Sequence, residues 1–159
     1  MSVYLSVAPP DGFTRWGDAE WESWLRDHPW EAAERLCSRG DWAIFLYQLR
    51  QHSPRAGARL QPLLDALVNE RPLTSQQTRD LRDVLRAARD ELSAKPAKDA
   101  QTNQAFASAE DLEAMISAAR ARLGREPMLA DVWADLFSRI DPLLENAISQ
   151  ARGIYFGNV

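Results

Sequence analysis

The most apolar stretch of the chain is residues 41–50, DWAIFLYQLR. Its large apolar side chains recur at i, i+3, i+4 and i+7, which places them on one face of a helix. They are Trp42, Phe45, Leu46 and Leu49. Ile44 and Tyr47 add apolar surface on the other side, which is typical of a helix inside a bundle. A buried strand is the competing interpretation, but only Ile44 is β-branched and Asp41 is a suitable N-cap.

Two shorter helices are predicted ahead of this central helix. The first covers residues 18–28, with Asp18 as its cap, and ends before Pro29. The second covers residues 30–38, and Gly40 suits the C′ position beyond it. The inward side chains would be Trp21, Trp24, Leu25 and His28 in the first helix, and Trp30, Ala33, Leu36 and Cys37 in the second.

The middle of the chain shows two further helical faces. Residues 55–70 are periodic, but Pro62 lies within them, so this helix could begin only at Pro62. Thr74 and Gln77 match a capping box, which opens a helix that runs to about residue 94.

The last third predicts two long helical runs. Ser108 caps the first, whose apolar face is Leu112, Met115, Ile116, Ala119 and Leu123, and Gly124 ends it. Pro127 begins the second, whose apolar stripe continues in phase past Pro142. A kink at Pro142 is favoured over a new helix capped by Asp141.

The predicted fold is therefore mainly α, a six- to seven-helix bundle in a single domain spanning residues 1–159. A small, polar, aperiodic stretch at about residues 95–107 reads as a flexible loop between two helical halves. Residues 2–8 are β-prone and precede a turn. They could pair with residues 153–159 as a minor two-stranded element, or both ends could cover one end of the bundle. A coil that packs Tyr155 and Phe156 against helices is the alternative.

Charge narrows the choice of partners. The net charge is −4 and the pI is about 5.2, which disfavours nucleic acid and anionic membranes and permits a basic protein partner. The basic residues are almost all Arg, a compositional hint of a bacterial source. No signal peptide or transmembrane run is visible, and the single Cys37 rules out an internal disulfide, so we expect a cytoplasmic protein.

Chemistry-bearing patterns are sparse, and we predict no catalytic residues, no cofactor and no metal. His28 and His52 both end predicted helices, where the helix dipole favours a partly charged imidazole. An end-cap or a packed edge is favoured over catalysis for both. Cys37 is expected to be a buried, inert thiol. Asp131 and Asp135 are one helical turn apart and could share a divalent cation, but a solvated surface is favoured.

The sharpest charged feature is a basic stripe on the helix that follows Thr74. The stripe consists of Arg79, Arg82, Arg86 and Arg89, spaced i, i+3, i+7 and i+10. It could contact a phosphate backbone or an acidic partner. Asp80, Asp83, Asp90 and Glu91 flank the stripe and largely neutralise it, so a solvated face is the favoured interpretation.

The first third is rich in tryptophan and carboxylates. Trp16 precedes the cap of the first predicted helix and Trp30 follows Pro29 in a tight link, so either could be partly exposed. Exposed Trp is enriched at binding hot spots. The candidate aromatic-acidic segment is Trp16, Asp18, Glu20, Glu22, Asp27, Trp30 and Glu31. An aromatic patch rimmed by carboxylates would suit a basic protein. A core position or a hydrophobic staple is the competing interpretation for each Trp.

These observations lead to three hypotheses. The first is a non-catalytic bacterial binding protein, of the immunity or antitoxin type, that occludes a basic toxin domain. The second is a nucleic-acid-linked regulator that uses the basic stripe. The third is a small helical enzyme that combines His28 or His52 with a carboxylate. An apolar face on an outer helix could also form a homo-oligomer.

Overall fold

The computed structural model describes residues 2–8, 34–68, 72–100 and 109–158, together with residues 19, 23, 26 and 27. The strands are β1 (Ser2–Val7), β2 (Glu34–Ser38) and β3 (Ile154–Asn158). The α-helices bounded within these ranges are α2 (Arg39–His52), α3 (Pro54–Val68), α4 (Ser75–Leu92), α5 (Ala109–Leu123), α6 (Leu129–Val132) and α7 (Ala134–Ser149). A short 3₁₀ helix, η2, spans Ala97–Asp99. The prediction of a mainly helical fold with a minor β element is confirmed.

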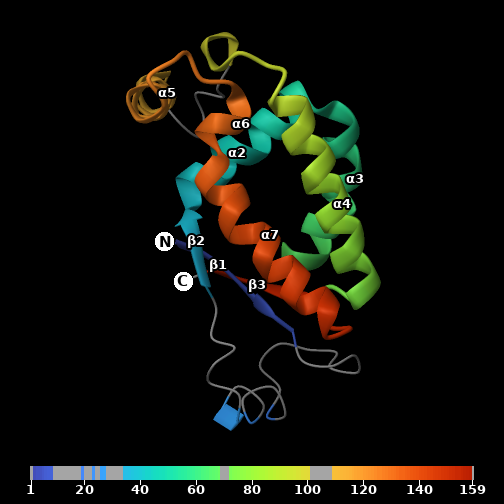
Figure 1. The fold of residues 1–159 in the computed structure, drawn as a ribbon. Coiled ribbons are helices and arrows are strands. Elements are labelled where there is room, and N and C mark those ends of the chain that lie inside the picture. The colour runs from blue at the N-terminus through green and yellow to red at the C-terminus, as the bar shows by residue number, and fades with distance from the viewer. Residues whose placement is uncertain are drawn as a thin grey trace.

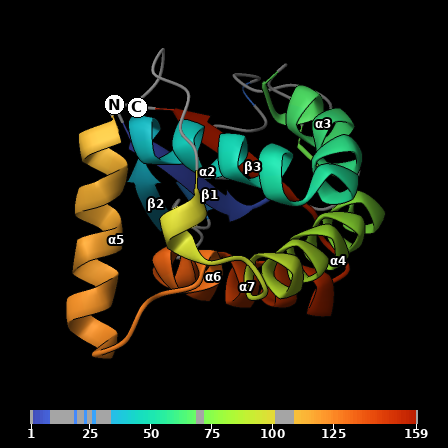
Figure 2. The ribbon, with the colours of Figure 1, turned by 90° about the horizontal axis from the view of Figure 1, so that it is seen from above.

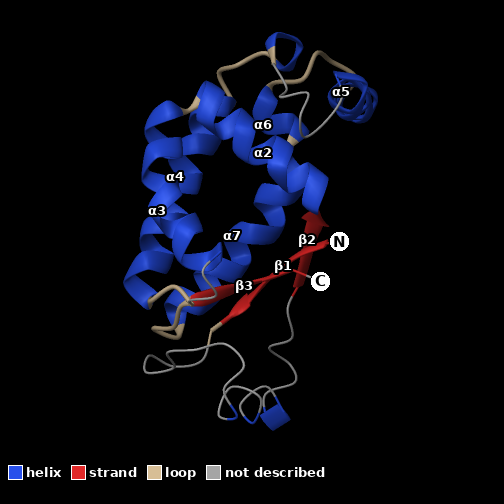
Figure 3. Ribbon diagram, turned by 180° about the vertical axis from the view of Figure 1, so that it is seen from behind, coloured by secondary structure: helices blue, strands red, loops and turns tan. Residues whose placement is uncertain are grey.

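The helices form a ring that is closed at one end by a sheet. Helices α2, α3, α4 and α7 follow one another around this ring, and the three strands lie across its lower end (Figure 1, Figure 2). Coloured by secondary structure, the strands form a separate layer against α7 and α2 (Figure 3). Helix α5 stands beside the ring next to α6.

The sheet joins the two ends of the described chain. Its strand order is β2-β1-β3 and both pairings are antiparallel. Pairing of the terminal segments is confirmed, with Val3 opposite Asn158 and Val7 opposite Ile154. Val3, Leu5 and Val7 alternate along β1 and are buried against the helices, which is the period of a half-buried strand.

Strand β2 replaces the second half of the helix predicted at residues 30–38, and residues 30–33 lie outside the described residues. Cys37 pairs with Val3 and Arg35 pairs with Tyr4, so Leu36 is an extra residue that forms a bulge. Leu36 is buried, while Cys37 is only partly buried. The helix prediction was wrong because pairing with β1 supplies the backbone hydrogen bonds of this segment, a long-range interaction that local periodicity does not show.

Helix α2 confirms the predicted central helix, but it begins at Arg39, before the predicted cap Asp41. The N-cap is Ser38, not Asp41: the Ser38 hydroxyl accepts a hydrogen bond from the Asp41 N–H at 3.0 Å. Gly40 consequently lies in the first turn of α2 and does not end a preceding helix. Phe45 is fully buried, with its ring centroid 5.6 Å from Trp42, 5.3 Å from Trp133 and 5.4 Å from Phe137.

The next two helices pack against α2 in sequence. Helix α3 begins at Pro54 and continues through Pro62, so a start at Pro62 is ruled out. The capping box of α4 is confirmed: Gln77 N–H donates to the Thr74 hydroxyl at 3.1 Å, and Thr74 N–H donates to the Gln77 side chain at 3.0 Å. The apolar face of α4 is buried at Leu81, Val84, Leu85, Ala88 and Leu92.

The predicted loop at about residues 95–107 is partly structured. Pro96 bridges Met128, and the Ala97 N–H donates to the Pro127 carbonyl at 3.0 Å. Ala97 is fully buried, so residues 95–100 are part of the packed structure; residues 101–108, including the predicted cap Ser108, lie outside the described residues. Gly124 ends α5 with φ of +68°, as predicted, but Leu123 is exposed and not in the core.

The final helical run divides at Trp133. Pro127 precedes the helices instead of beginning one, and α6 ends before Trp133. Helix α7 then continues through Pro142, so a fresh helix capped by Asp141 is ruled out and the prediction of one helix there is confirmed. The predicted helix at residues 18–28 lies largely outside the described residues; residues 19, 23, 26 and 27 are helical.

Candidate functional site

The aromatic-acidic segment belongs to the connection between β1 and β2. Six of its seven candidate residues, Trp16, Asp18, Glu20, Glu22, Trp30 and Glu31, lie outside the described residues. Asp27 is described, and it is helical and exposed. The structure therefore shows where this segment is attached, and it shows the environment of one member.

Both attachment points lie at the same end of the sheet. The continuously described backbone stops at Ala8, just after β1, and resumes at Glu34, which pairs with Leu5. The Ala8 end is held by backbone contacts: its N–H donates to the Gly153 carbonyl at 2.8 Å, and its carbonyl accepts from Arg152 Nε at 2.7 Å. Residues 9–33 thus connect neighbouring antiparallel strands, for which a hairpin turn of about two to five residues would suffice.

The basic stripe faces α7, and two of its four arginines are paired there. Arg86 donates through Nε and Nη2 to both carboxylate oxygens of Asp141, at 2.9 and 3.0 Å, and through Nη2 to Glu145 at 2.7 Å. Arg82 reaches Glu145 at 3.1 Å and its neighbour Asp83 at 3.0 Å. The acids that neutralise the stripe are therefore mainly on α7, and not only the flanking acids on α4.

Arg79 and Arg89 differ from the two inner arginines. Both are exposed, and among the described residues neither guanidinium has a hydrogen bond or ion pair. A phosphate backbone would therefore meet two unpaired cations at the ends of the stripe and two neutralised ones between them. This arrangement gives little support to the nucleic-acid hypothesis.

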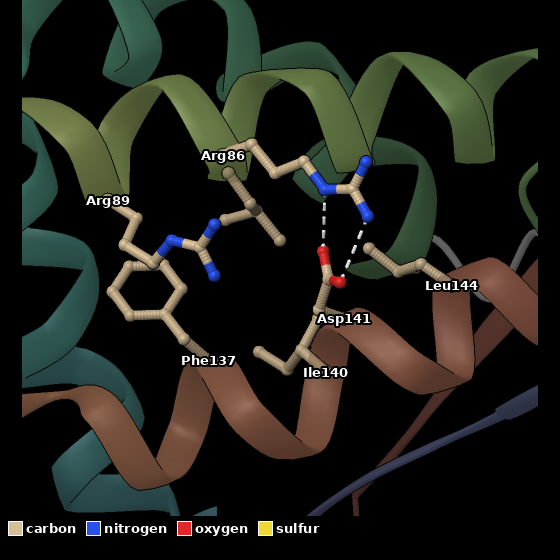
Figure 4. A pocket seen from close by; sticks show the side chains of 7 residues that line it. Arg86, Arg89, Phe137, Ile140, Asp141 and Leu144 are labelled. Atoms are coloured by element: carbon tan, nitrogen blue, oxygen red, sulfur yellow. Dashed lines mark hydrogen bonds and ion pairs between the residues drawn. The ribbon is translucent and has the colours of Figure 1, made fainter.

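A shallow pocket opens between α4 and α7 beside these ion pairs. Its apolar wall is Leu85, Phe137, Ile140 and Leu144, and its polar rim is Arg86, Arg89 and Asp141. Figure 4 shows Asp141 joined to Arg86, while Arg89 extends from α4 above the Phe137 ring without an interaction to the side chains drawn. Hydrogen bonding from Arg86 lowers the pKa of Asp141 despite partial burial, so this carboxylate remains ionised.

His52 does not have the partly charged imidazole that its helix-end position suggested. Burial lowers its pKa, and the nearby Lys95 charge lowers it further, while Asp99 acts in the opposite direction. Its Nε2 atom is buried and has no hydrogen-bond partner among the described residues. A neutral imidazole without a bonded carboxylate lacks the pairing expected of the proposed His–carboxylate site. His28 lies outside the described residues.

The other candidates for chemistry, Cys37, Asp131 and Asp135, are partly buried or paired within the fold. Burial, with Asp41 nearby, raises the pKa of the Cys37 thiol to about 11, so this thiol stays protonated at neutral pH. Asp131 accepts hydrogen bonds from the Met128 N–H at 2.8 Å and from Arg125 at 3.0 Å, and Asp135 pairs with Arg139 at 3.1 Å. In the described part of the chain, no group of three or more His, Cys, Asp or Glu could hold a metal ion.

Asp141 and Glu145 are the residues that sequence reasoning missed at this site. Asp141 was considered only as a helix cap, and Glu145 was not considered. Their i, i+4 spacing on one helix matches that of Arg82 and Arg86 on another, which is the pattern of two helices joined by ion pairs. The matched spacing can be recognised from the sequence only if α4 and α7 are assumed to be neighbours.

No protein-family model, curated protein or solved structure matches this chain. Among the described helices, none combines the length and apolar character needed to span a membrane.

Proposed function

We propose that this protein is a non-catalytic binding protein of the immunity or antitoxin type, which occludes a basic toxin domain with its aromatic-acidic segment. The proposal includes a bacterial, cytoplasmic setting, in which such an inhibitor would meet its toxin. It rests on one structural relationship: the segment is inserted between two paired strands of the sheet.

This attachment favours binding because a rigid scaffold presents the segment. Surface connections longer than the roughly two to five residues that a hairpin needs are where binding residues commonly lie. Here the sheet and its backbone contacts at Ala8 fix both ends of residues 9–33. An insertion can therefore vary in sequence and bind a partner while the helical ring is preserved.

Charge and residue type supply the second support. The segment concentrates Trp and carboxylates in a chain whose net charge is −4, and the described member, Asp27, is exposed. Trp anchors surrounded by acids complement a basic surface: the indole rings supply buried area and the carboxylates accelerate association with a cationic partner.

The test of this proposal is to identify a binding partner and to ask whether that partner is toxic to cells. The tagged full chain is used to co-purify proteins from its source cells, and each captured protein is then expressed alone and with the chain. The expected result is a captured protein that arrests growth by itself and is neutralised by co-expression. A partner that is not toxic, or one whose toxicity the chain does not relieve, contradicts the immunity role.

Variants then locate the interface. Trp16→Ala combined with Glu20→Lys should weaken the complex by at least about tenfold, because it removes an anchor and reverses a charge. The matched control, Leu123→Ala combined with Glu110→Lys, makes the same kinds of change at exposed positions of α5 and should leave affinity unchanged. Equal affinity of both double variants would show that the segment is not the interface.

A further inference from the structure

A second, wholly apolar pocket lies inside the helical ring, directly behind the pocket between α4 and α7. Side chains from β1, α2, α3, α4 and α7 line it, among them Leu5, Trp42, Phe45 and Leu64. Among the described residues, no charged side chain contributes to its lining. A space lined only by apolar groups stays dry, and it can accept an apolar group if side-chain movement enlarges it.

Two residues separate the inner pocket from the outer one. Leu85 of α4 and Ile140 of α7 line both. The outer pocket continues the apolar surface through Phe137 and Leu144 to the polar rim. The two pockets are therefore adjacent, and the side chains of Leu85 and Ile140 form the partition between them.

Among the described residues, the rim of the outer pocket carries one cation that makes no hydrogen bond, Arg89. Asp141 is occupied by Arg86 through two hydrogen bonds, so the Arg86 charge is already neutralised. Arg89 lines the same pocket, and its charge helps to lower the pKa of Asp141, but its guanidinium makes no hydrogen bond or ion pair among the described residues. Figure 4 shows it above the Phe137 ring, at the edge of the apolar wall. An unpaired guanidinium beside apolar surface is suited to a ligand with one anionic end and one hydrocarbon end.

We propose that the chain binds a single-chain aliphatic carboxylate at this site. Its carboxylate pairs with Arg89, its hydrocarbon chain lies on Phe137 and Leu144, and the end of the chain passes between Leu85 and Ile140 toward the inner pocket. The unoccupied space is narrow, so the chain enters by changing the side-chain rotamers of Leu85 and Ile140. This site is independent of the aromatic-acidic segment and of the proposed toxin partner.

The test compares ligands that differ in one property at a time. Sodium butanoate, hexanoate and octanoate, and neutral 1-octanol, are titrated calorimetrically into the full chain below their aggregation concentrations. Affinity should rise by up to about fourfold for each methylene added, because each one leaves water for the apolar pockets. Octanoate should bind about tenfold more tightly than octanol, since only the anion pairs with Arg89.

Variants assign these two effects to residues. Arg89→Gln should reduce octanoate affinity to that of octanol and leave octanol unchanged. Arg79→Gln is the matched control, since it removes an exposed, unpaired cation from the same helix outside the pocket. Leu64→Phe narrows the inner pocket and should remove the gain from hexanoate to octanoate; Leu81→Phe serves the same purpose if the first variant does not fold.

Three outcomes would overturn the proposal. One is the absence of octanoate binding to the folded chain. Another is an equal loss of affinity in Arg89→Gln and Arg79→Gln, which would show general electrostatic attraction. The third is an affinity independent of chain length, which would show a contact with the arginine alone.

Discussion

Arg86 of α4 donates two parallel hydrogen bonds to the carboxylate of Asp141 on α7, at 2.9 and 3.0 Å. This geometry fits the planar guanidinium fork and fixes the register of one helix against the other. The Arg86 side chain is 40% exposed and the Asp141 side chain is 32% exposed, so solvent weakens the interaction between them. The pair therefore orients two helices whose association depends mainly on their buried apolar faces.

The first prediction concerns this pair. Arg86→Gln and Asp141→Asn should each lower the free energy of unfolding slightly, and the double variant should lose less than the sum of the single losses. The measurement is a double-mutant cycle by urea denaturation. The ion pair between Arg120 and Glu126 is the control, because it is local and more exposed and should show a smaller coupling. Additive losses at Arg86 and Asp141 would show that the two side chains do not interact in solution.

Acid should weaken the same ion pair in a defined pH range. The folded pKa of Asp141 lies below the ordinary value of 3.8, so its contribution is present above that value and is lost as pH falls through the lower, folded pKa. Urea denaturation below about pH 4 should therefore show a steeper loss of stability in the wild type than in Asp141→Asn. Parallel curves for the two proteins would contradict the lowered pKa.

Phe45 is the side chain whose removal should cost most in the core. It is fully buried and contacts three other aromatic rings, Trp42, Trp133 and Phe137. Phe45→Ala should lower the free energy of unfolding by about 3–5 kcal/mol, measured by denaturation followed by circular dichroism. Leu123→Ala, on an exposed side chain, should change it by less than about 0.5 kcal/mol. A small effect at Phe45 would mean that α2 is not central to the core.

Elements specified by local signals could be predicted from the sequence, and elements specified by long-range pairing could not. Helix α4 has a capping box at Thr74 and a regular apolar stripe, both of which lie within its own residues. Strand β2 has no comparable signal, because its hydrogen bonds come from β1, far away in the chain, and its bulge at Leu36 interrupts alternation. Local periodicity therefore predicts a short helix there.

The candidate sites also contain some features that follow from local sequence and others that follow only from long-range packing. The positions of the four stripe arginines on one helix face were readable from spacing alone, but their partners Asp141 and Glu145 required the packing of α4 on α7. The inner apolar pocket required the packing of the whole ring, since its described lining comes from β1, α2, α3, α4 and α7. The tryptophan and carboxylate segment was recognised by composition, which gives the chemistry of a surface and not its shape.

Gly153 is required by a close approach of two backbone segments. A Cβ added there would lie 1.6 Å from the Leu73 carbonyl oxygen, beside the hydrogen bond from the Leu73 N–H to the Ile154 carbonyl. Gly153→Ala should therefore displace β3 and lower the free energy of unfolding by at least about 3 kcal/mol.

Two other glycines serve as graded controls for this prediction. Gly124→Ala meets no atom within 4 Å but keeps φ at +68°, so it should cost about 1–2 kcal/mol. Gly40→Ala, near the start of α2 with its closest contact at 3.8 Å, should be neutral or stabilise by up to about 1 kcal/mol. All three are compared by chemical denaturation. A Gly153 variant no less stable than the Gly124 variant would mean that the two segments are farther apart than described.

His52 should make stability depend on pH in the range where imidazole titrates. Its folded pKa lies below the ordinary 6.5 because of burial and Lys95, so the unfolded chain binds the proton more readily. The contribution of the neutral His52 to the free energy of unfolding is therefore fully present above about pH 6.5. It is lost as pH decreases toward the folded pKa of His52. The free energy of unfolding is measured at about pH 8 and about pH 5 in two proteins, His28→Gln and His28→Gln combined with His52→Gln. The protein that keeps His52 should lose more of its free energy of unfolding at the lower pH. Equal losses in the two proteins would show that the imidazole is solvated and titrates normally.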